Sequence, residues 1–199
     1  MAANQLRNFR IGLWGLILLI ALGAGGFYLL RPPAGAGVAF GGGTYSLVDG
    51  SAKPFTAQSL KGQPTMLFFG YIHCPDVCPT TLAEMAGWFE QLGDQGKALR
   101  AVFVTVDPER DTTAIINDYV HAVSDRITGV TGPRPEIDKI IKVWGVYAKK
   151  VPLDGADYNM DHTATVFLLD SQGNFQGTIA YQEDQATALQ KLKNLIAKG

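Results

Sequence analysis

The stretch TMLFFGYIHCPDVCPTTLAEMAGWFEQL, residues 65–92, decides the fold class of this chain. It opens on a continuous apolar run at 65–71, which is typical of a strand buried on both faces of a sheet. Its second half repeats apolar residues at helical spacing, and Gly93 is a common helix-ending residue. Cys74 and Cys78 lie between the two patterns, at the carboxyl end of the expected strand. Open α/β sheets bind their ligands at such ends.

The same two patterns alternate through the rest of the chain. We expect a hairpin near 44–55, strands over 99–106, 127–130, 163–169 and 175–181, and helices over 112–120, 135–147 and 184–197. Asp111 is the expected N-cap of the helix that follows it. Alternating strands and helices that end in a strand hairpin and a helix predict an α/β sandwich.

Composition excludes several classes of function. The chain has 199 residues, of which 47% are hydrophobic, enough for one folded domain and an appendage. The net charge of −1 argues against nucleic-acid binding, since phosphate recognition needs a basic face. The two cysteines enclose so short a loop that a disulfide there would remove little unfolded-state entropy. We therefore interpret the pair as a chemical site.

The N-terminal segment predicts a membrane anchor. Residues 11–30 carry no charge, and about 20 apolar residues span a bilayer. Arg7 and Arg10 precede the run and favour a cytoplasmic N-terminus. A cleaved signal peptide is the alternative, although its apolar core is usually about 7–15 residues long. The expected organisation is a cytoplasmic tail at 1–10, a transmembrane helix at 11–30, a Pro/Gly/Ala-rich tether at 31–43 and an exported domain over 44–199.

The cysteine pair predicts thiolate chemistry. At a helix start, Cys74 and Cys78 would lie one turn apart on one face. Free N–H groups and the helix dipole stabilise thiolates there, and thiolate is the form that binds metals and attacks disulfides. His162, just before the expected strand at 163–169, is a candidate third ligand, although a lone histidine in such a place is more often a surface residue. An inert buried pair of cysteines is the alternative.

Three segments resemble the signatures of the Sco/SenC family. They are GYIHCPDVCPTTL at 70–82, VDPERDT at 106–112 and DHT at 161–163, in the family's order and approximate spacing. The resemblance covers essentially the whole expected domain. It implies a thioredoxin-like, three-layer α/β sandwich in which copper, as Cu(I) or Cu(II), is bound by two cysteines and a distal histidine. The matching positions are Cys74, Cys78 and His162.

The resemblance also implies a role and a location. The role is a metallochaperone that delivers copper to the dinuclear copper site of cytochrome c oxidase subunit II, or that reduces the cysteines of that site. Other copper chaperones or thiol reductants are further partners. The location is the bacterial inner membrane, with a single span, the N-terminus inside and the domain in the periplasm, the equivalent of the mitochondrial intermembrane space.

Two other functions use the same cysteines. A thiol–disulfide oxidoreductase or redox sensor needs only Cys74 and Cys78, and a peroxidase of the peroxiredoxin type also uses a cysteine at this junction. Thioredoxin-type oxidoreductases place a cis-proline where this chain has His162 and Thr163, and they use CxxC instead of CxxxC. Both departures favour metal binding over general disulfide exchange.

Neighbours of the motifs carry weaker expectations. We expect His73 to tune the thiolates or to face solvent, and His121 to lie on the surface. Asp161 either holds the adjacent histidine ring as an outer-shell partner or is solvated. Met160 is more often a packing residue than a ligand in such a position. For the charged residues Asp107, Glu109, Arg110 and Asp111, an ion-paired loop beside the site is one interpretation, and a structural turn that helps to dock a partner is the one we favour.

Overall fold

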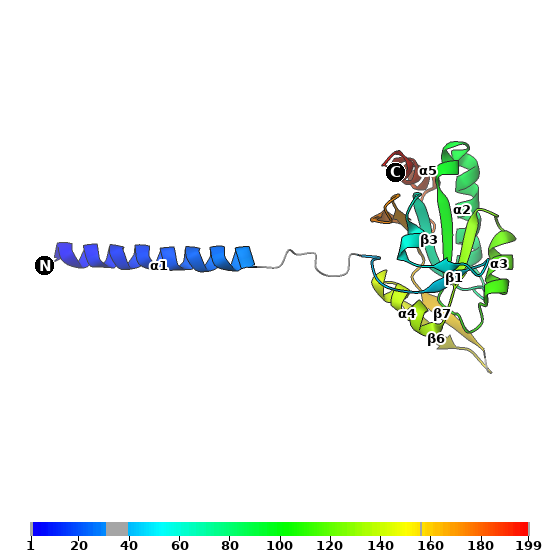
Figure 1. Cartoon of the computed structure of the whole chain (residues 1–199), viewed down its shortest axis with the longest axis horizontal. Coiled ribbons are helices and arrows are strands. Elements are labelled where there is room, and N and C mark those ends of the chain that lie inside the picture. Colours follow the sequence, from blue (N-terminus) through cyan, green and yellow to red (C-terminus); the bar gives the residue numbers. More distant parts are fainter. Residues whose placement is uncertain (1, 31–39, 156, 199) are drawn as a thin grey trace. The chain divides into compact units, whose positions relative to one another are not determined.

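The computed structural model describes residues 2–30, 40–155 and 157–198, in two compact units that divide after residue 39. The first unit is one helix, α1 (Ala2–Leu30) (Figure 1). It includes the apolar run at 11–30 and extends through most of the expected tail. In the described ranges, no helix is found that is long and apolar enough to cross a membrane. The expected tether falls largely on 31–39, outside the described residues.

A seven-stranded mixed sheet forms the middle layer of the second unit. Its strands lie in the order β2-β1-β5-β4-β3-β8-β9. Their bounds are β1 (Leu47–Asp49), β2 (Pro54–Phe55), β3 (Thr65–Gly70), β4 (Arg100–Thr105), β5 (Ile127–Thr131), β8 (Thr165–Leu169) and β9 (Phe175–Ala180). β3 lies between β4, its parallel neighbour, and β8, its antiparallel neighbour. Every residue of β3 is buried, as the unbroken apolar run predicts.

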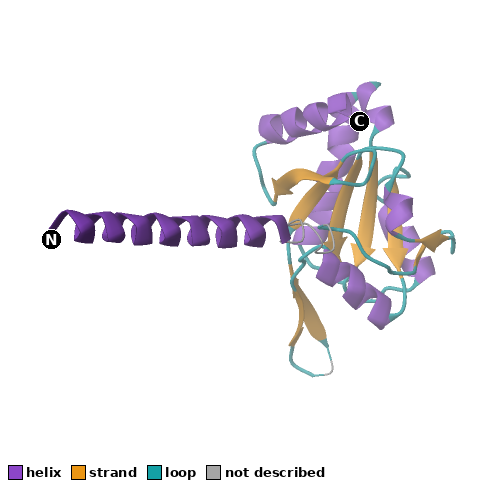
Figure 2. Cartoon of the chain, turned by 60° about the vertical axis from the view of Figure 1, so that its left-hand side comes forward, coloured by secondary structure: helices purple, strands orange, loops and turns teal. Residues whose placement is uncertain are grey.

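Helices cover both faces of this sheet (Figure 2). Their bounds are α2 (Val77–Leu92), α3 (Thr113–His121), α4 (Arg134–Val143) and α5 (Gln185–Lys198), with short 3-10 helices η1 (Ala57–Leu60) and η2 (Gln95–Ala98). On one face the ring of Phe103 lies 5.9 Å from that of Tyr119 in α3, and α2 and α5 pack side by side. On the other face Phe167 lies 5.6 Å from Trp144, which follows α4. The domain is therefore the expected three-layer α/β sandwich.

A second, two-stranded sheet is an addition to the expected fold. β6 (Ala148–Pro152) pairs antiparallel with β7 (Tyr158–His162), where we expected a loop leading into the next strand. The connection between them contains Asp154-Gly155, a dipeptide that favours tight turns, and Gly155 adopts a φ of +84°. His162 is the last residue of β7. A strand therefore presents this imidazole.

The expectation that Asp111 caps α3 is wrong. Thr112 is the N-cap, and Asp111 is fully buried. Its carboxylate accepts hydrogen bonds from the backbone N–H of Ile72 at 3.1 Å and from the hydroxyl of Thr105 at 2.6 Å. These buried donors need an acceptor, so they draw the side chain inward and away from the helix terminus.

The compact domain begins at Phe40, four residues before the expected boundary at Thr44. The ring of Phe40 packs edge-on against Trp144 and Phe175, with centroid distances of 5.5 and 4.9 Å. The N–H of Gly41 donates to a carbonyl at the end of α4 at 2.8 Å. Gly41 has a φ of +78°, and a Cβ at this position would collide with the Trp144 ring. Only glycine lets the chain pass this close to the indole.

Candidate metal centre

Cys78 lies in the first turn of α2, which follows β3 after a turn at residues 71–76. The helix begins at Val77, with Asp76 as its N-cap. Cys74 is therefore in the turn before the helix, and the expectation that both cysteines share a helix face is wrong. Pro75 supplies the reason, because a residue that precedes proline is disfavoured in helical backbone. Cys74 approaches the helix end from outside.

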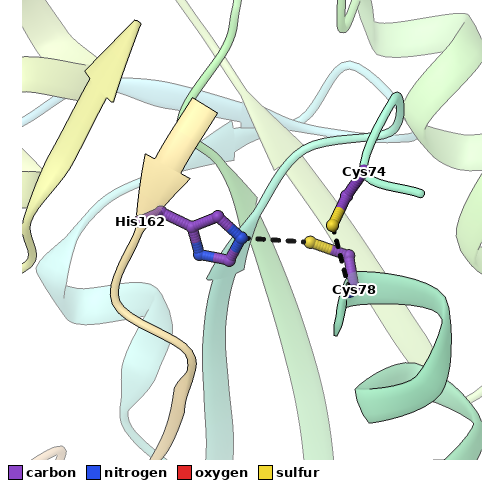
Figure 3. Close-up of side chains that lie close together, drawn as sticks. All are labelled: Cys74, Cys78 and His162. Carbon is purple, nitrogen blue, oxygen red and sulfur yellow. Dashed lines mark hydrogen bonds between the residues drawn. The ribbon is translucent and has the colours of Figure 1, made fainter. Parts of the chain in front are cut away.

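The two cysteines still meet at the helix N-terminus (Figure 3). The backbone N–H of Cys78 donates to Sγ of Cys74 at 3.4 Å. The Cys74 sulfur thus occupies the place where a helix stabilises an anion. Cys74 is partly exposed, whereas Cys78 is fully buried.

His162 completes a cluster of three candidate ligands. Its Nε2 lies 3.3 Å from Sγ of Cys78. The candidate ligand atoms of Cys74, Cys78 and His162 all lie within 4.8 Å of one another. Figure 3 shows the imidazole projecting from the end of β7 toward the sulfurs. The fold therefore brings together the three residues that the sequence analysis singled out.

The neighbour of the His162 ring determines its tautomer. Nδ1 lies 3.1 Å from the carbonyl oxygen of Thr163. A carbonyl can only accept, so Nδ1 carries the proton and donates it to this bond. Nε2 is left with a lone pair that faces the sulfurs, which is the form of imidazole that binds a metal. Asp161, which the sequence offered as an outer-shell partner of this ring or as a solvated residue, is exposed and lies opposite Lys149 in the register of the hairpin.

The two thiols share one proton. The hydrogen bond from Cys78 is the largest of the effects that together lower the pKa of Cys74 to about 3; the backbone N–H groups of Asp76 and Cys78 also lower it, and burial opposes them. The same hydrogen bond to the Cys74 sulfur raises the pKa of Cys78, and burial adds to this effect. Cys74 is therefore a thiolate at neutral pH, and Cys78 holds its proton until a cation or an electrophile replaces it.

A cleft connects the cluster to the surface. Its volume is about 260 Å³, and it is lined by the cysteine turn and by β7, including Cys74 and His162. Two aromatic rings wall the histidine, since the centroids of Tyr71 and Phe68 lie 5.8 and 6.2 Å from that of His162. A ligand in the cleft meets the thiolate and the imidazole first, with Cys78 buried behind them.

The other singled-out residues lie outside the cluster. His73 is half exposed, and its Nδ1 lies 3.9 Å from a carboxylate oxygen of Asp111. Met160 is buried in β7, as a packing residue. His121 is exposed at the end of α3, as expected. Neither histidine belongs to the metal-ligand group found among the described residues.

The loop at 107–111 is ion-paired, which is the alternative to the favoured interpretation. Arg110 pairs with Asp107, and Glu109 pairs with Arg134. Sequence reasoning missed one partner of this loop. The hydroxyl of Tyr158 in β7 donates to Asp107 at 2.8 Å, a contact that depends on the unpredicted hairpin.

The donor set limits the metals that suit this cluster. Two sulfurs and one imidazole nitrogen form a soft to borderline set. Such donors favour Cu(I), Cu(II) or Zn(II), whereas Mg²⁺ and Ca²⁺ prefer oxygen ligands. Copper therefore fits the residues that are present.

The fold and the cluster define a class of protein, namely thioredoxin-like domains with a two-thiol, one-imidazole centre at the end of a central strand. Residues 34–197 match the family described as SCO1/SenC. The chain belongs to this family, which confirms the resemblance seen in its three motifs.

Relatives and solved structures agree with this assignment. The chain is 30% identical to Protein SCO2, mitochondrial, of Saccharomyces cerevisiae, with 96% of this chain and 69% of the relative covered. It is 36% identical to Protein SCO1 homolog 1, mitochondrial, of Arabidopsis thaliana, with 70% and 42% covered, so it spans less than half of that relative. The structure of Bradyrhizobium japonicum ScoI with copper bound is 42% identical, with a TM-score of 0.71 and coverage of 77% and 98%. Yeast Sco1 with copper bound is 30% identical, with a TM-score of 0.72 and coverage of 79% and 88%.

Proposed function

We propose that this protein is a copper metallochaperone that holds one copper ion through Cys74, Cys78 and His162. The observation that carries the proposal is the three-residue cluster, whose ligand atoms all lie within 4.8 Å of one another. Two thiolates and an imidazole suit Cu(I) and also accept Cu(II). The copper-bound structures of Bradyrhizobium japonicum ScoI and yeast Sco1 support copper as the cargo.

The free site is prepared for metal uptake. Cys74 is already a thiolate and lines the cleft, so it makes the first contact. Cys78 then gives up its proton as the charge of the metal replaces it. The Thr163 carbonyl holds the His162 ring with Nε2 directed at the sulfurs, so the third ligand needs little rearrangement.

The client in this proposal is the dinuclear copper site of cytochrome c oxidase subunit II. The protein either delivers copper to that site or keeps its cysteines reduced. The Sco/SenC motifs support this client, and the partly exposed Cys74 sulfur gives a client thiol an approach to the cargo. Other copper chaperones or thiol reductants would load or reduce the protein.

The proposal includes a membrane anchor at residues 11–30. The twenty uncharged residues of this run and the two arginines before it support a single span with the N-terminus inside. The domain would then work in the periplasm of a bacterium, at its inner membrane. Fractionation of cells that express the full chain, with alkaline extraction of the membranes, tests the anchor. Release of the protein into the soluble fraction would reject it.

Copper titration tests the three-ligand site. Reduced protein is titrated with Cu(I) against a competing chelator, in wild type, His162→Ala and His121→Ala. We expect one copper per chain and a loss of affinity of about 100-fold or more in His162→Ala, since even outer-shell partners contribute about 10–100-fold. His121→Ala, which removes an exposed imidazole elsewhere, should bind like wild type. Equal affinity in all three proteins would reject His162 as a ligand.

Copper transfer tests the client. Loaded protein is mixed with a reduced subunit II fragment, and copper and thiols are followed in parallel. Metal that moves while the thiol count stays constant supports delivery. A second reaction starts from the oxidised fragment and metal-free protein, and loss of the fragment's disulfide there supports reduction. If neither copper transfer nor disulfide reduction is seen, subunit II is rejected as the client.

A second function is favoured by the asymmetry of the two thiols. A thiolate at Cys74 beside a protonated Cys78 suits attack on a client disulfide, after which Cys78 displaces the reduced client and a Cys74–Cys78 disulfide remains. Two electrons pass to the client in this exchange. The protein would then act as a thiol–disulfide oxidoreductase or redox sensor. We expect the oxidised protein to lose copper, and copper retained after oxidation would contradict a site built on both thiolates.

A further inference from the structure

The hairpin β6–β7 stands apart from the seven-stranded sheet and yet carries one of the three candidate ligands. At its base, the N–H of Thr163 donates to the Tyr147 carbonyl at 3.0 Å, and the N–H of Tyr147 donates to the Thr163 hydroxyl at 2.9 Å. These bonds close the base of the hairpin. Because they join its two arms to each other, other contacts must set the direction in which the hairpin leans.

A second attachment lies at the far end of β7. The hydroxyl of Tyr158, the first residue of this strand, donates to one oxygen of Asp107 at 2.8 Å. Nε of Arg110 donates to the other oxygen of the same carboxylate. The guanidinium carbon of Arg110 lies 3.7 Å from the centroid of the Tyr158 ring, in a cation–π contact. We call Asp107, Arg110 and Tyr158 the hairpin clamp.

The burial of Asp107 explains why the clamp needs both of its donors. Asp107 is fully buried, so its charge must be paired and each of its oxygens needs a donor. Tyr158 and Arg110 supply one donor each. Arg110 also donates through Nη1 to Asp157 at 3.0 Å, so two successive hairpin residues are tied to one guanidinium. A planar, rigid fork suits such a two-sided contact.

The loop that carries Asp107 and Arg110 also holds the cysteine turn. Asp111 accepts the N–H of Ile72, two residues before Cys74, at 3.1 Å. One short loop therefore contacts both parts of the candidate metal site, through Asp111 on the cysteine side and through the clamp on the histidine side. The loop sets the distance between the two parts.

The geometry of β7 connects the clamp to His162. Side chains alternate along a strand, so Tyr158, Met160 and His162 share one face. Tyr158 bonds to the loop, Met160 is buried and His162 reaches Cys78. We propose that the hairpin clamp positions His162, so that Tyr158, Arg110 and Asp107 act on the metal through this histidine without touching it. The inference rests on the proposed role of His162 as a ligand.

A double-mutant cycle tests this positioning role. Tyr158→Phe removes one hydroxyl and leaves the ring beneath Arg110. We expect it to weaken Cu(I) binding about 10-fold, at the lower end of the range for outer-shell partners. In a His162→Ala background the same substitution should have no further effect, because the histidine through which it acts is gone. Tyr147→Phe, at an exposed tyrosine before β6, is the matched control and should leave the affinity unchanged.

Hydrogen exchange of the metal-free protein gives a readout that does not depend on copper. Tyr158→Phe should speed amide exchange in β7 and leave β3 unchanged, whereas a general loss of stability would speed both. Arg110→Lys should act in the same direction, because an ammonium keeps the charge but lacks the planar fork.

The two proposals fail in different ways. The clamp is overturned if the losses of Cu(I) affinity in Tyr158→Phe and His162→Ala add in the double mutant, or if Tyr158→Phe leaves amide exchange in β7 unchanged. Either result leaves the three-ligand site in place. Unchanged affinity in His162→Ala alone would overturn that site, and the positioning role would fall with it.

Discussion

Nε2 of His162 and Sγ of Cys78 lie 3.3 Å apart, although 84 positions separate them in the chain. The first residue ends β7 and the second lies in the first turn of α2, so the cluster exists only when both elements are in place. An unfolded chain retains the close cysteine pair but loses the imidazole. Copper should therefore bind the folded protein more tightly and raise its free energy of unfolding.

The asymmetry of the thiols predicts an ordered reactivity. The hydrogen bond from Cys78 is the largest of the effects that lower the pKa of Cys74 to about 3. Wild type should therefore react with iodoacetamide first at Cys74, at a rate that hardly changes between pH 5 and pH 7. In Cys78→Ala the pKa of Cys74 rises, so its rate should fall as the pH falls. Mass spectrometry of alkylated peptides across this pH range measures both rates. A flat profile in Cys78→Ala would show that the partner thiol has no such effect.

The Cys78 sulfur leaves no room for a side chain at position 70, so the site should require Gly70. A Cβ on this last residue of β3 would lie 2.7 Å from Sγ of Cys78 and 2.7 Å from the Phe103 ring. Gly70→Ala should therefore lower the free energy of unfolding by about 1–3 kcal/mol, as overpacking does, and should weaken copper binding because the sulfur is displaced. Urea unfolding and chelator competition measure the two effects.

Gly87→Ala is the matched control for this substitution. Gly87 lies in the middle of α2, where a Cβ would meet only the end of Gln91 at 4.0 Å. Alanine should stabilise the helix there by up to about 1 kcal/mol and leave copper binding unchanged. If Gly70→Ala also proves neutral in both assays, the space under Cys78 is not a requirement of the site.

The buried carboxyl group of Asp111 should make the free energy of unfolding depend on pH. Burial raises its pKa from 3.8 to about 6, against the lowering effects of the Thr105 and Ile72 hydrogen bonds. The folded state then holds this proton more tightly than the unfolded state. The stabilisation is complete below about pH 4 and is lost as the pH rises through 6. Two pKa units correspond to about 3 kcal/mol as an upper figure.

Asp111→Asn should remove this pH-dependent contribution to the free energy of unfolding, because the amide keeps an acceptor oxygen but does not titrate. The free energy of unfolding, measured in urea at pH 4 and pH 7, should fall less between pH 4 and pH 7 in the variant than in wild type. Taking the difference between the two proteins cancels the other titrating groups. Equal changes with pH would contradict a raised pKa at Asp111.

Local patterns predicted the parts of the fold whose causes are local. The buried run at 65–70 and the helical spacing behind it define β3 and α2, because burial and periodicity can be read within a few residues. The start of α2 was predicted less accurately, since Pro75 excludes Cys74 from the helix. The N-cap rule failed at Asp111 because its partner Ile72 lies 39 positions away.

The hairpin β6–β7 shows a different limit. AKKVP and YNMDH have no clear alternation of apolar and polar residues, and their pairing is non-local. The Asp154-Gly155 turn was the available signal. His162 as a candidate ligand came from the family resemblance, because nothing in its own surroundings in the sequence distinguishes it from a surface histidine. Its tautomer and its clamp depend on Thr163 and Tyr158 in three dimensions.

The N-terminal edge of the domain predicts a measurable contribution to stability. Phe40 packs against Trp144 and Phe175 but keeps 47% of its surface exposed. Phe40→Ala should lower the free energy of unfolding by about 1–2 kcal/mol, less than the 3–5 kcal/mol of a fully buried phenylalanine. Leu153→Ala, at a similarly exposed residue in the hairpin connection, is the control and should change it by about 0.5 kcal/mol or less. A chain that starts at Thr44 should lose more than Phe40→Ala, because it also lacks the Gly41 hydrogen bond to the end of α4. Equal stability of this shortened chain and a chain that starts at Phe40 would place the edge of the cooperative domain at Thr44.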